Sequence, residues 1–486
     1  MLGSLFAFYV TRYLAISIIV ASLIFGLTIT VAILKRKVKY FLIPLTAFVF
    51  AVSIFNISTY AFNKDNISKP NTIQARVYSI SSTKQGYMVL KADSCKFDEK
   101  EKRTNLTIYV YDDESLFNDI EIGSIIKFKP KNFYKSDLNY HDIPDAKMFA
   151  DNLKYTATTD IESVSLLGVD KTFVEKIKQE IKTNLSGNLT NENVELAYSA
   201  LFGDKELLGE EQYRAYRLSG VAHLLAVSGL HVSIIVAVIS KILYLCKVKG
   251  WYNFAIIVLF LVFYAYICNF SVSVLRAGIM SLLVLLSALL HREYDPLTSI
   301  GLAGIVVFII NPLCVFDISF LMSFGCAFGI VLFSKPISIA LKAMKMPNKV
   351  ADAMAITLST LLSLIIISAY FFQNFNMISI IANLIIIPIF TMAFSVVFVV
   401  SLLSLIVPHI AVVLNPFNYI FDLINIFATT LGNFKYANIS TTALNFIAVP
   451  VYFALLFMIS RICVAKHTNK IIISLSILAI LALCLL

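Results

Sequence analysis

The sequence predicts a polytopic α-helical membrane protein of about 12 spans, with one small β-strand domain inserted after the second span. Composition is the first reason: 58% of the 486 residues are hydrophobic and only 14% are charged, against roughly 25% charged in soluble domains. The mean hydropathy is +0.81. Pattern is the second reason, because apolar stretches of about 20 residues recur along the chain. Residues 62–169 interrupt them with a polar stretch.

The spans are expected wherever an apolar stretch approaches the length of about 20 residues that crosses a bilayer. The first run is too long for the core of a signal peptide, and a second run follows, so we expect a retained span. Pro388 predicts a broken or partly re-entrant helix in the span that contains it. The spans are expected at residues 13–34, 40–61, 220–245, 252–270, 273–291, 297–311, 313–334, 351–372, 379–407, 411–432, 443–461 and 471–486.

Orientation follows from basic residues, which concentrate in the cytoplasmic loops of membrane proteins. Lys35, Arg36, Lys37 and Lys39 mark the first loop as cytoplasmic. Counting spans from that loop places the polar domain outside and every later basic loop inside. We therefore expect a multi-pass protein of the bacterial cytoplasmic membrane with both termini extracytoplasmic.

The polar stretch predicts a small barrel, because it contains five short strands with alternating β-branched and aromatic residues. The OB-fold is the natural candidate. Residues 64–165 hold 15 lysines and arginines and 16 acidic residues, so the domain lacks the basic excess of a strong nucleic-acid grip. The formal net charge of +10 arises in the membrane half. The strands are expected at residues 72–80, 87–91, 105–111, 122–128 and 154–159.

A connector precedes the main membrane region. Residues 170–185 place their apolar side chains on one face of an amphipathic helix, which lies on the membrane or docks on the polar domain; the sequence does not choose. The predicted domains are N-terminal membrane helices at 1–61, an extracytoplasmic OB-like domain at 62–169, a helical connector at 170–219 and a transmembrane channel region at 220–486.

The sequence indicates no metal site, cofactor or disulfide framework. Its seven cysteines include no CxxC pair, and its six histidines include no HxH pair and no HExxH. No GxxxxGK[ST] phosphate-binding loop is present either, so the sequence indicates no energy source within the chain.

Residues 219–232, SGVAHLLAVSGLHV, combine an apolar stretch with His223, Ser228, Gly229 and His231. Polar groups at bilayer depth cost roughly 2–3 kcal/mol each, and they usually face a bundle interior or a hydrated cavity. Ser228 and His231 are three residues apart and share one helix face. A nucleophile–base pair is therefore the enzymatic alternative, although no carboxylate that would orient the histidine is evident nearby.

This stretch and several motifs that surround it in the sequence resemble the ComEC family of competence DNA-uptake channel proteins. The similarity covers most of residues 62–400. The motifs are GSIIKF at 123–128, ALFGDK at 200–205, YRLSG at 216–220, HLLAVSGLHV at 223–232, SVLRA at 273–277, DPL at 295–297, NP at 311–312, FDISFLMSF at 316–324 and SIIANL at 379–384.

The resemblance implies a channel, not an enzyme, that translocates single-stranded DNA across the cytoplasmic membrane in natural transformation. It implies as partners, besides the lipid bilayer, a DNA-receptor protein, a separate nuclease and a cytosolic ATPase motor. Many members add a C-terminal metallo-β-lactamase-like domain. The sequence ends at Leu486 without an HxHxDH cluster, so the expected form lacks that domain and its nuclease activity.

A translocator of a phosphate chain needs a hydrated path with polar or cationic lining. Simpler roles remain open for the candidates: histidines bonded across helices, Arg276 reaching the interface or pairing with Asp317, and Asp317 capping a helix. The candidate lining residues are His223, Ser228, Gly229, His231, Arg276, Asp317 and Asn383.

Candidate DNA contacts outside the spans combine cations with aromatic rings, which single-strand binders use for phosphate contact and base stacking. The alternative is an ordinary strand with Phe128 in the core and the lysines in solvent, and a solvated turn for the arginine. The candidates are Arg217, Lys127, Lys129, Lys131, Phe133 and Tyr134.

Two other functions stay open on the same helical scaffold. One is a membrane-embedded hydrolase that acts through Ser228, and the other is a small-solute transporter. A shortened relative without activity is a further alternative.

Overall fold

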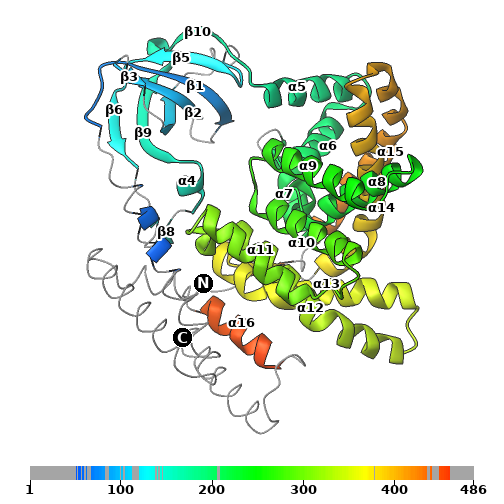
Figure 1. Ribbon diagram of the computed structural model, residues 1–486. Coiled ribbons are helices and arrows are strands. Elements are labelled where there is room, and N and C mark those ends of the chain that lie inside the picture. The colour runs from blue at the N-terminus through cyan, green and yellow to red at the C-terminus, as the bar shows by residue number, and fades with distance from the viewer. Residues whose placement is uncertain are drawn as a thin grey trace. The chain divides into compact units, whose positions relative to one another are not determined.

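The computed structural model divides the chain into two compact units. We call them the sheet unit (Met1–Lys176 with Val307–Asp317) and the helical unit (Ile177–Val306 with Ile318–Leu486). Figure 1 colours both along the chain. The structure describes residues 51–62 (without 52, 56, 60 and 61), 67–82, 87–98, 100–101, 104–111, 120–136, 139–140, 143–144, 146–204, 208–376, 378–434, 438–440 and 448–459. The expected spans at 13–34 and 471–486, most of that at 40–61, and the first basic loop lie outside these residues.

The sheet unit contains one eight-stranded sheet. Its strands are β1 (Ile73–Ser82), β2 (Tyr87–Phe97), β3 (Lys100–Glu101), β4 (Asn105–Tyr111), β5 (Ser124–Phe128), β6 (Asn132–Lys135), β9 (Leu153–Asp160) and β10 (Ser165–Val169). The main path runs β10-β5-β1-β2-β4-β9-β6, with β3 beside β2. The pair β4 and β9 is parallel. All five strands expected from the sequence are therefore present in one sheet.

The closed barrel expected from the sequence is not confirmed. In the described part of the chain the path ends at β10 and β6, and these two strands are not hydrogen-bonded to each other. Pro130 lies between β5 and β6, and proline cannot donate to a strand ladder. Strand β5 therefore ends before Pro130 and a separate strand, β6, begins after it. Strand β5 pairs with β1, whereas β6 pairs with β9. The structure thus contains a separate sheet domain in open form.

Alternation along the strands buries one face of the sheet. Ile73 and Val77 are fully buried, and Phe128 is 2% exposed, so the alternative of Phe128 as a core residue is correct. Cys95 lies in the same core. Burial, with a smaller contribution from Asp93, raises the pKa of the Cys95 thiol to about 12, and the thiol is therefore protonated at neutral pH.

An ion-pair network ties the sheet to the first turn of α5 (Phe173–Ser186). Arg76 on β1 contacts Asp93 on β2 at 2.5 Å and Glu175 on α5 at 2.9 Å. Burial alone would lower the pKa of Arg76, but the two carboxylates outweigh burial and raise it. Removing either carboxylate would leave a largely buried cation under-compensated, so the network fixes where the helix begins.

Short accessory elements complete the sheet unit. A two-stranded hairpin precedes a single helical turn before β9, and another short turn follows β9. The elements are β7 (Asn139–Tyr140), β8 (Ile143–Pro144), α4 (Ala146–Ala150), η3 (Ile161–Ser163) and η5 (Cys314–Phe316).

The helical unit consists of helices joined by short turns. Its elements are α6 (Asn191–Phe202), α7 (Glu210–Leu218), η4 (Ala222–Leu225), α8 (Gly229–Leu245), α9 (Trp251–Ile267), α10 (Val272–Leu289), α11 (Pro296–Ile310), α12 (Ile318–Ala343), α13 (Asn348–Phe372), β11 (Asn374–Asn376), α14 (Ser379–Ser404), η6 (Pro408–Leu414), α15 (Phe417–Gly432), β12 (Asn438–Ser440) and α16 (Ala448–Ile459). Strands β11 and β12 form an antiparallel pair.

Four described helices, α10, α12, α13 and α14, are long and apolar enough to cross a membrane. A fifth candidate arises if η6 and α15, bent by 49°, count as one span. The helices α8, α9 and α11 are apolar but shorter. Each span expected between residues 220 and 461 coincides with a helix, but the expected total of about 12 spans is not confirmed.

The helix break expected at Pro388 is wrong. Helix α14 runs without interruption from Ser379 to Ser404 with Pro388 inside it, and α12 likewise contains Pro336. Proline removes only its own N–H donor from the helix ladder, and neighbouring helices or side chains can satisfy the freed carbonyl in a membrane bundle.

Helices α12 and α13 lie side by side (Figure 1) because small residues face each other across them. A Cβ placed at Gly329 would lie 2.6 Å from the carbonyl oxygen of Ser359 and would overlap the hydroxyl of Ser363. A Cβ at Gly325, four residues earlier, would lie 3.2 Å from Ile367 on α13. This glycine spacing permits close backbone approach between membrane helices.

Helix α15 carries a polar stripe that is satisfied inside the unit. The Nδ2 of Asn193 on α6 donates to Asn418 Oδ1 at 3.1 Å and to Asp422 Oδ1 at 2.8 Å. Asn425 donates back to Asn193 Oδ1 at 3.3 Å and accepts from the Tyr216 hydroxyl at 2.8 Å. The stripe therefore joins α6 and α7 to a helix that the sequence predicted only as an apolar span.

The other face of α15 is apolar and open: Tyr419 is 80% exposed and Ile426 is 60% exposed. The preceding turn also exposes Ile406, at 81%. A helix with one bonded polar stripe and one exposed apolar stripe fits a position between the bundle and lipid.

Gly329→Ala should destabilise the protein by about 1–3 kcal/mol, because the added methyl group overpacks a contact between two backbones. Gly301→Ala is the matched control, since a Cβ at that helical glycine meets nothing within 4 Å. Thermal unfolding of the purified protein in detergent measures both variants. Equal midpoints would contradict the small-residue contact.

Asn193→Ala should lower stability by about 2 kcal/mol, since it removes a fully buried amide and leaves Asn418, Asp422 and Asn425 short of a partner. Asn433→Ala, at the exposed end of α15, should leave the unfolding midpoint unchanged. A midpoint for Asn193→Ala that matches this control would show that the network contributes nothing to stability.

Candidate functional site

The motif at residues 219–232 folds as a turn that introduces α8. Helix α7 ends at Leu218, and Gly220 has a φ of +78°, a conformation that favours glycine. The short helix η4 follows, and Ser228 is the N-cap of α8. The expectation that Ser228 and His231 share a helix face is therefore replaced by a helix cap.

His231 stands three residues into α8, where its side chain can turn back to the cap. Its Nδ1 accepts the backbone N–H of Ser228 at 2.9 Å and lies 3.1 Å from the Ser228 hydroxyl. Because Nδ1 is the acceptor, the neutral ring carries its proton on Nε2. The contact closes the first turn of α8 and holds the imidazole in one orientation.

The His231 ring is fully buried against α14. Its centroid lies 4.4 Å from that of Phe394 and 5.5 Å from that of Phe390. Within the described part of the chain, its buried Nε2 has no hydrogen-bond partner. A catalytic base needs a third group that orients it, and the described residues supply none at Nε2.

Arg276 on α10 meets the start of α8. Its Nη1 donates to the carbonyl oxygen of Ser323 on α12 at 2.7 Å. A Cβ built at Gly229 would lie 2.6 Å from Nη2, so glycine provides the space for the guanidinium. Among the described residues, no carboxylate lies within 4.0 Å of it, and the pairing with Asp317 is not observed.

We name Ser228, Gly229, His231, Arg276 and Ser323 the polar cluster. It joins α8, α10 and α12, with α14 covering the histidine. Three of its buried atoms have no hydrogen-bond partner in the described structure: His231 Nε2, Arg276 Nε and Ser323 Oγ. Buried polar atoms are usually satisfied by protein, ordered water or a ligand, so the cluster has unused capacity for polar guests.

The remaining lining candidates lie in different settings. Asn383 lies in the second turn of α14, and its buried Oδ1 also lacks a partner in the described structure. His223 is exposed on η4. Asp317 is half-buried, belongs to the sheet unit and directly precedes α12, which is the position that a capping carboxylate takes.

The candidate DNA contacts of the sheet unit separate into surface and core residues. Lys127, Lys129 and Lys131 are exposed, and Lys131 pairs with Asp160 at 2.8 Å. Tyr134 is 51% exposed, so its ring is open to solvent.

Phe133, the other aromatic candidate for base stacking, has different surroundings from Tyr134. Its ring stacks on Tyr155 at 5.2 Å and packs against Phe97 at 5.8 Å. The ring is therefore half-buried and packs against the core of the sheet, whereas that of Tyr134 is open to solvent. On α7 of the helical unit, Arg217 is exposed, as either of its expected roles requires.

Sequence reasoning missed the partners that complete the cluster. Ser323 lies within the FDISFLMSF motif but was not selected, because its contribution is a backbone carbonyl. Phe390 and Phe394 look like ordinary apolar residues of a span. The polar stripe of α15 had a signal, since Asn418, Asp422 and Asn425 follow helical spacing.

No group of three or more histidine, cysteine, aspartate or glutamate side chains in the described ranges could hold a metal ion. The arrangement is therefore one of hydrogen-bond donors around an arginine. Its chemistry suits the binding of anionic or strongly polar groups.

The sequence of this chain is similar to those of known proteins. The family model described as Competence protein matches residues 200–466, which include the whole polar cluster. ComE operon protein 3 of Bacillus subtilis (strain 168) is 27% identical over 235 residues, 48% of this chain and 30% of that protein.

Recombination protein 2 of Haemophilus influenzae (strain ATCC 51907 / DSM 11121 / KW20 / Rd) is 25% identical over 194 residues, 38% of this chain and 24% of that protein. The chain therefore aligns with less than a third of the length of each of these relatives. No solved structure matches.

Gly229→Ala should push the Arg276 guanidinium away from α8 and weaken its bond to Ser323, at a cost of roughly 1 kcal/mol. Gly278→Ala on α10 is the control, because a Cβ there meets nothing within 4 Å. Unfolding midpoints in detergent compare the two. A Gly229→Ala protein as stable as its control would show that the close approach is unimportant.

Proposed function

Because this chain belongs to the Competence protein family, we propose that it is a channel that passes single-stranded DNA across the bacterial cytoplasmic membrane in natural transformation. The family match covers more than half of the chain and contains every helix of the polar cluster. The two relatives carry the names ComE operon protein 3 and Recombination protein 2. A role in DNA uptake is consistent both with the family and with an apolar helical scaffold.

The proposed topology is multi-pass, with both termini and the sheet domain outside. It is supported by apolar helices at the positions where the sequence places spans, and by basic residues in the loops that this count puts inside. The proposed domains keep their boundaries at 1–61, 62–169, 170–219 and 220–486.

The observation that carries the proposal is a cation that meets no carboxylate among the described residues of an apolar bundle. Arg276 is held by one carbonyl and by space at Gly229. Buried arginines in membrane helices are expensive and generally serve transport or binding. A guanidinium matches the geometry of a phosphate group, so Arg276 is proposed to contact the passing DNA backbone.

The other lining candidates are assigned by their surroundings. His231 is proposed to fix the entry turn of α8. Its Nε2, which has no hydrogen-bond partner among the described residues, is proposed to bond water or DNA. Asn383 on α14 adds a further buried polar atom, Oδ1, that has no hydrogen-bond partner in the described part of the chain. His223, exposed on η4, and Asp317, before α12, are proposed to border the path.

The sheet domain is proposed to guide the strand as an OB-like module. The parallel pair of β4 and β9 and the five expected strands support the likeness. Lys127, Lys129 and Tyr134 offer cations and an exposed ring, which suits phosphate contact and stacking. Arg217 is proposed as a further phosphate contact.

The proposal assigns the chain no covalent chemistry. Ser228 caps a helix and His231 Nδ1 is occupied by the cap, which disfavours the hydrolase alternative. A cytosolic ATPase, a DNA receptor and a nuclease are the proposed partners that would drive, deliver and process the DNA.

Arg276→Gln should reduce DNA uptake at least tenfold, because it removes the charge that meets the phosphates, and Arg276→Lys should retain an intermediate level. The measurement follows labelled DNA into the cytosol of transformable cells that carry this gene. Immunoblots of membrane fractions establish that the variants are inserted at normal amounts. Arg214→Gln, an exposed arginine on α7, is the control for loss of one charge.

Deletion of the gene provides the reference for complete loss. Uptake that survives deletion would reject the channel role. If uptake is lost on deletion but normal in Arg276→Gln, the channel role stands and Arg276 returns to a packing role.

A further inference from the structure

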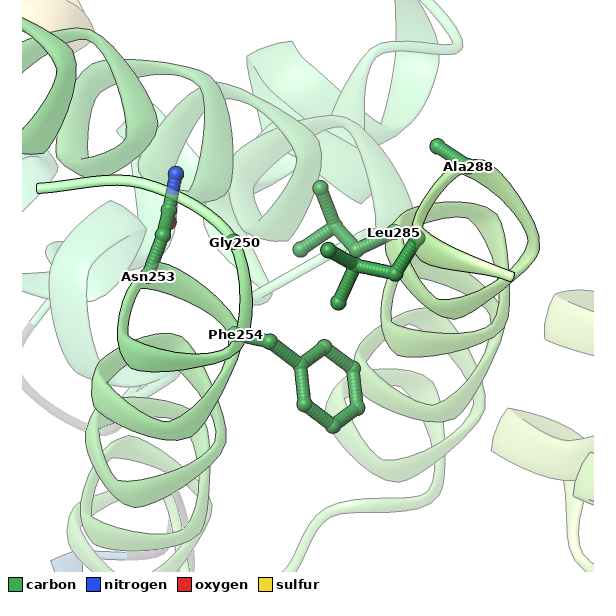
Figure 2. A pocket seen from close by; sticks show the side chains of 6 residues that line it. Gly250, Asn253, Phe254, Leu285 and Ala288 are labelled. Carbon is green, nitrogen blue, oxygen red and sulfur yellow. The ribbon is translucent and has the colours of Figure 1, made fainter. Parts of the chain in front are cut away.

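A pocket of about 210 Å³ opens between the start of α9 and the end of α10. Figure 2 shows Phe254 and Leu285 extending into it from the two helices. It shares no residue with the polar cluster. Its lining consists of Gly250, Asn253, Phe254, Leu285, Ala288 and Leu289.

The lining is apolar apart from one amide. The buried Oδ1 of Asn253 has no hydrogen-bond partner in the described part of the chain. Gly250, with a φ of +61°, makes the turn into α9, and a Cβ there would meet nothing within 4 Å. The pocket is therefore open at the turn that contains Gly250. A molecule that fits it needs an apolar body and a polar group near Asn253.

Basic residues flank, in the sequence, the two segments that line the pocket. Lys247 and Lys249 lie in the turn between α8 and α9, and Arg292 follows α10 directly after the segment that lines the pocket. All three are exposed, and none forms an ion pair with another described residue. Glu293 and Asp295 are the acidic residues that follow Arg292, so three cations outnumber two carboxylates and these turns keep an excess of positive charge.

Exposed aromatic side chains lie at the same end of α9 as the pocket. Trp251 is 59% exposed and Tyr252 is 78% exposed, both in the first turn of α9. Exposed tryptophan and tyrosine at helix ends are typical of the membrane–water boundary. The pocket therefore opens where lipid headgroups lie, with its apolar lining toward the acyl chains.

We propose that this pocket binds an anionic phospholipid. One acyl chain occupies the space between Phe254 and Leu285, and the phosphate lies against Lys247, Lys249 and Arg292. Basic pockets between membrane helices suit anionic headgroups in this way. The inference is independent of the channel role, since it uses only the helix ends around the pocket.

Trp251 is the only tryptophan of the chain, and its ring centroid lies 6.0 Å from that of Phe254. Bromine atoms on an acyl chain quench tryptophan fluorescence on close contact, so the intrinsic fluorescence of the protein reports on this pocket. The experiment reconstitutes the full chain in phosphatidylcholine vesicles. It compares brominated phosphatidylglycerol with brominated phosphatidylcholine at equal low mole fraction.

Brominated phosphatidylglycerol should quench Trp251 at least twofold more than brominated phosphatidylcholine. The triple variant Lys247→Gln, Lys249→Gln, Arg292→Gln should lose this preference. The control removes three other exposed lysines, by Lys335→Gln, Lys345→Gln and Lys349→Gln, and should keep it at the same net charge.

Ala288→Phe tests the pocket itself, because it fills the space while all three cations remain. This variant should also lose the preference. Equal quenching by both lipids in the wild type would overturn the proposal, and so would a preference that survives the triple variant. If Ala288→Phe keeps the preference for brominated phosphatidylglycerol, the proposal is also overturned, because the surface charges alone would then attract the lipid.

Discussion

Polar groups inside an apolar bundle need partners within the bundle, and this constraint organises the helical unit. Asn193 meets it by bonding to Asn418 and Asp422, while Tyr216 bonds to Asn425. Without these bonds, the fully buried Asn193 and Tyr216 would be costly to keep inside the bundle. The connector helices α6 and α7 are therefore integral to the helical unit, and the loop and cap that follow them start from a fixed frame.

The polar cluster meets this need for hydrogen-bond partners only in part. Arg276, His231 and Ser323 each keep a buried atom without a partner in the described structure, although the cap at Ser228 and the bond to the Ser323 carbonyl hold them in place. The amide side chains of the α15 stripe bond to that of Asn193 and so serve stability, whereas a positioned and incompletely bonded cation retains capacity for a ligand. This contrast is the physical basis for assigning function to the cluster and architecture to the α15 stripe.

The sequence predicted elements well and contacts poorly. Apolar length located the helices between residues 220 and 461, and alternation located five strands, because both signals are local. Pro388 did not break α14, since the bundle tolerates one missing donor. Phe133 packs against the core, because the register that stacks it on Tyr155 depends on pairing between β6 and β9. Strand closure also depends on partners distant in sequence.

The sequence by itself determined an apolar helical scaffold, a separate sheet domain and the motif that contains Ser228 and His231. Composition and periodicity carry that information, because burial and chain geometry act on every residue locally. Only the tertiary structure decided that Phe390 and Phe394 cover His231, that Gly229 makes room for Arg276, and that Asn193 joins α6 to α15. These roles depend on atoms that meet across helices, often tens to hundreds of residues apart, and no local pattern encodes such distances.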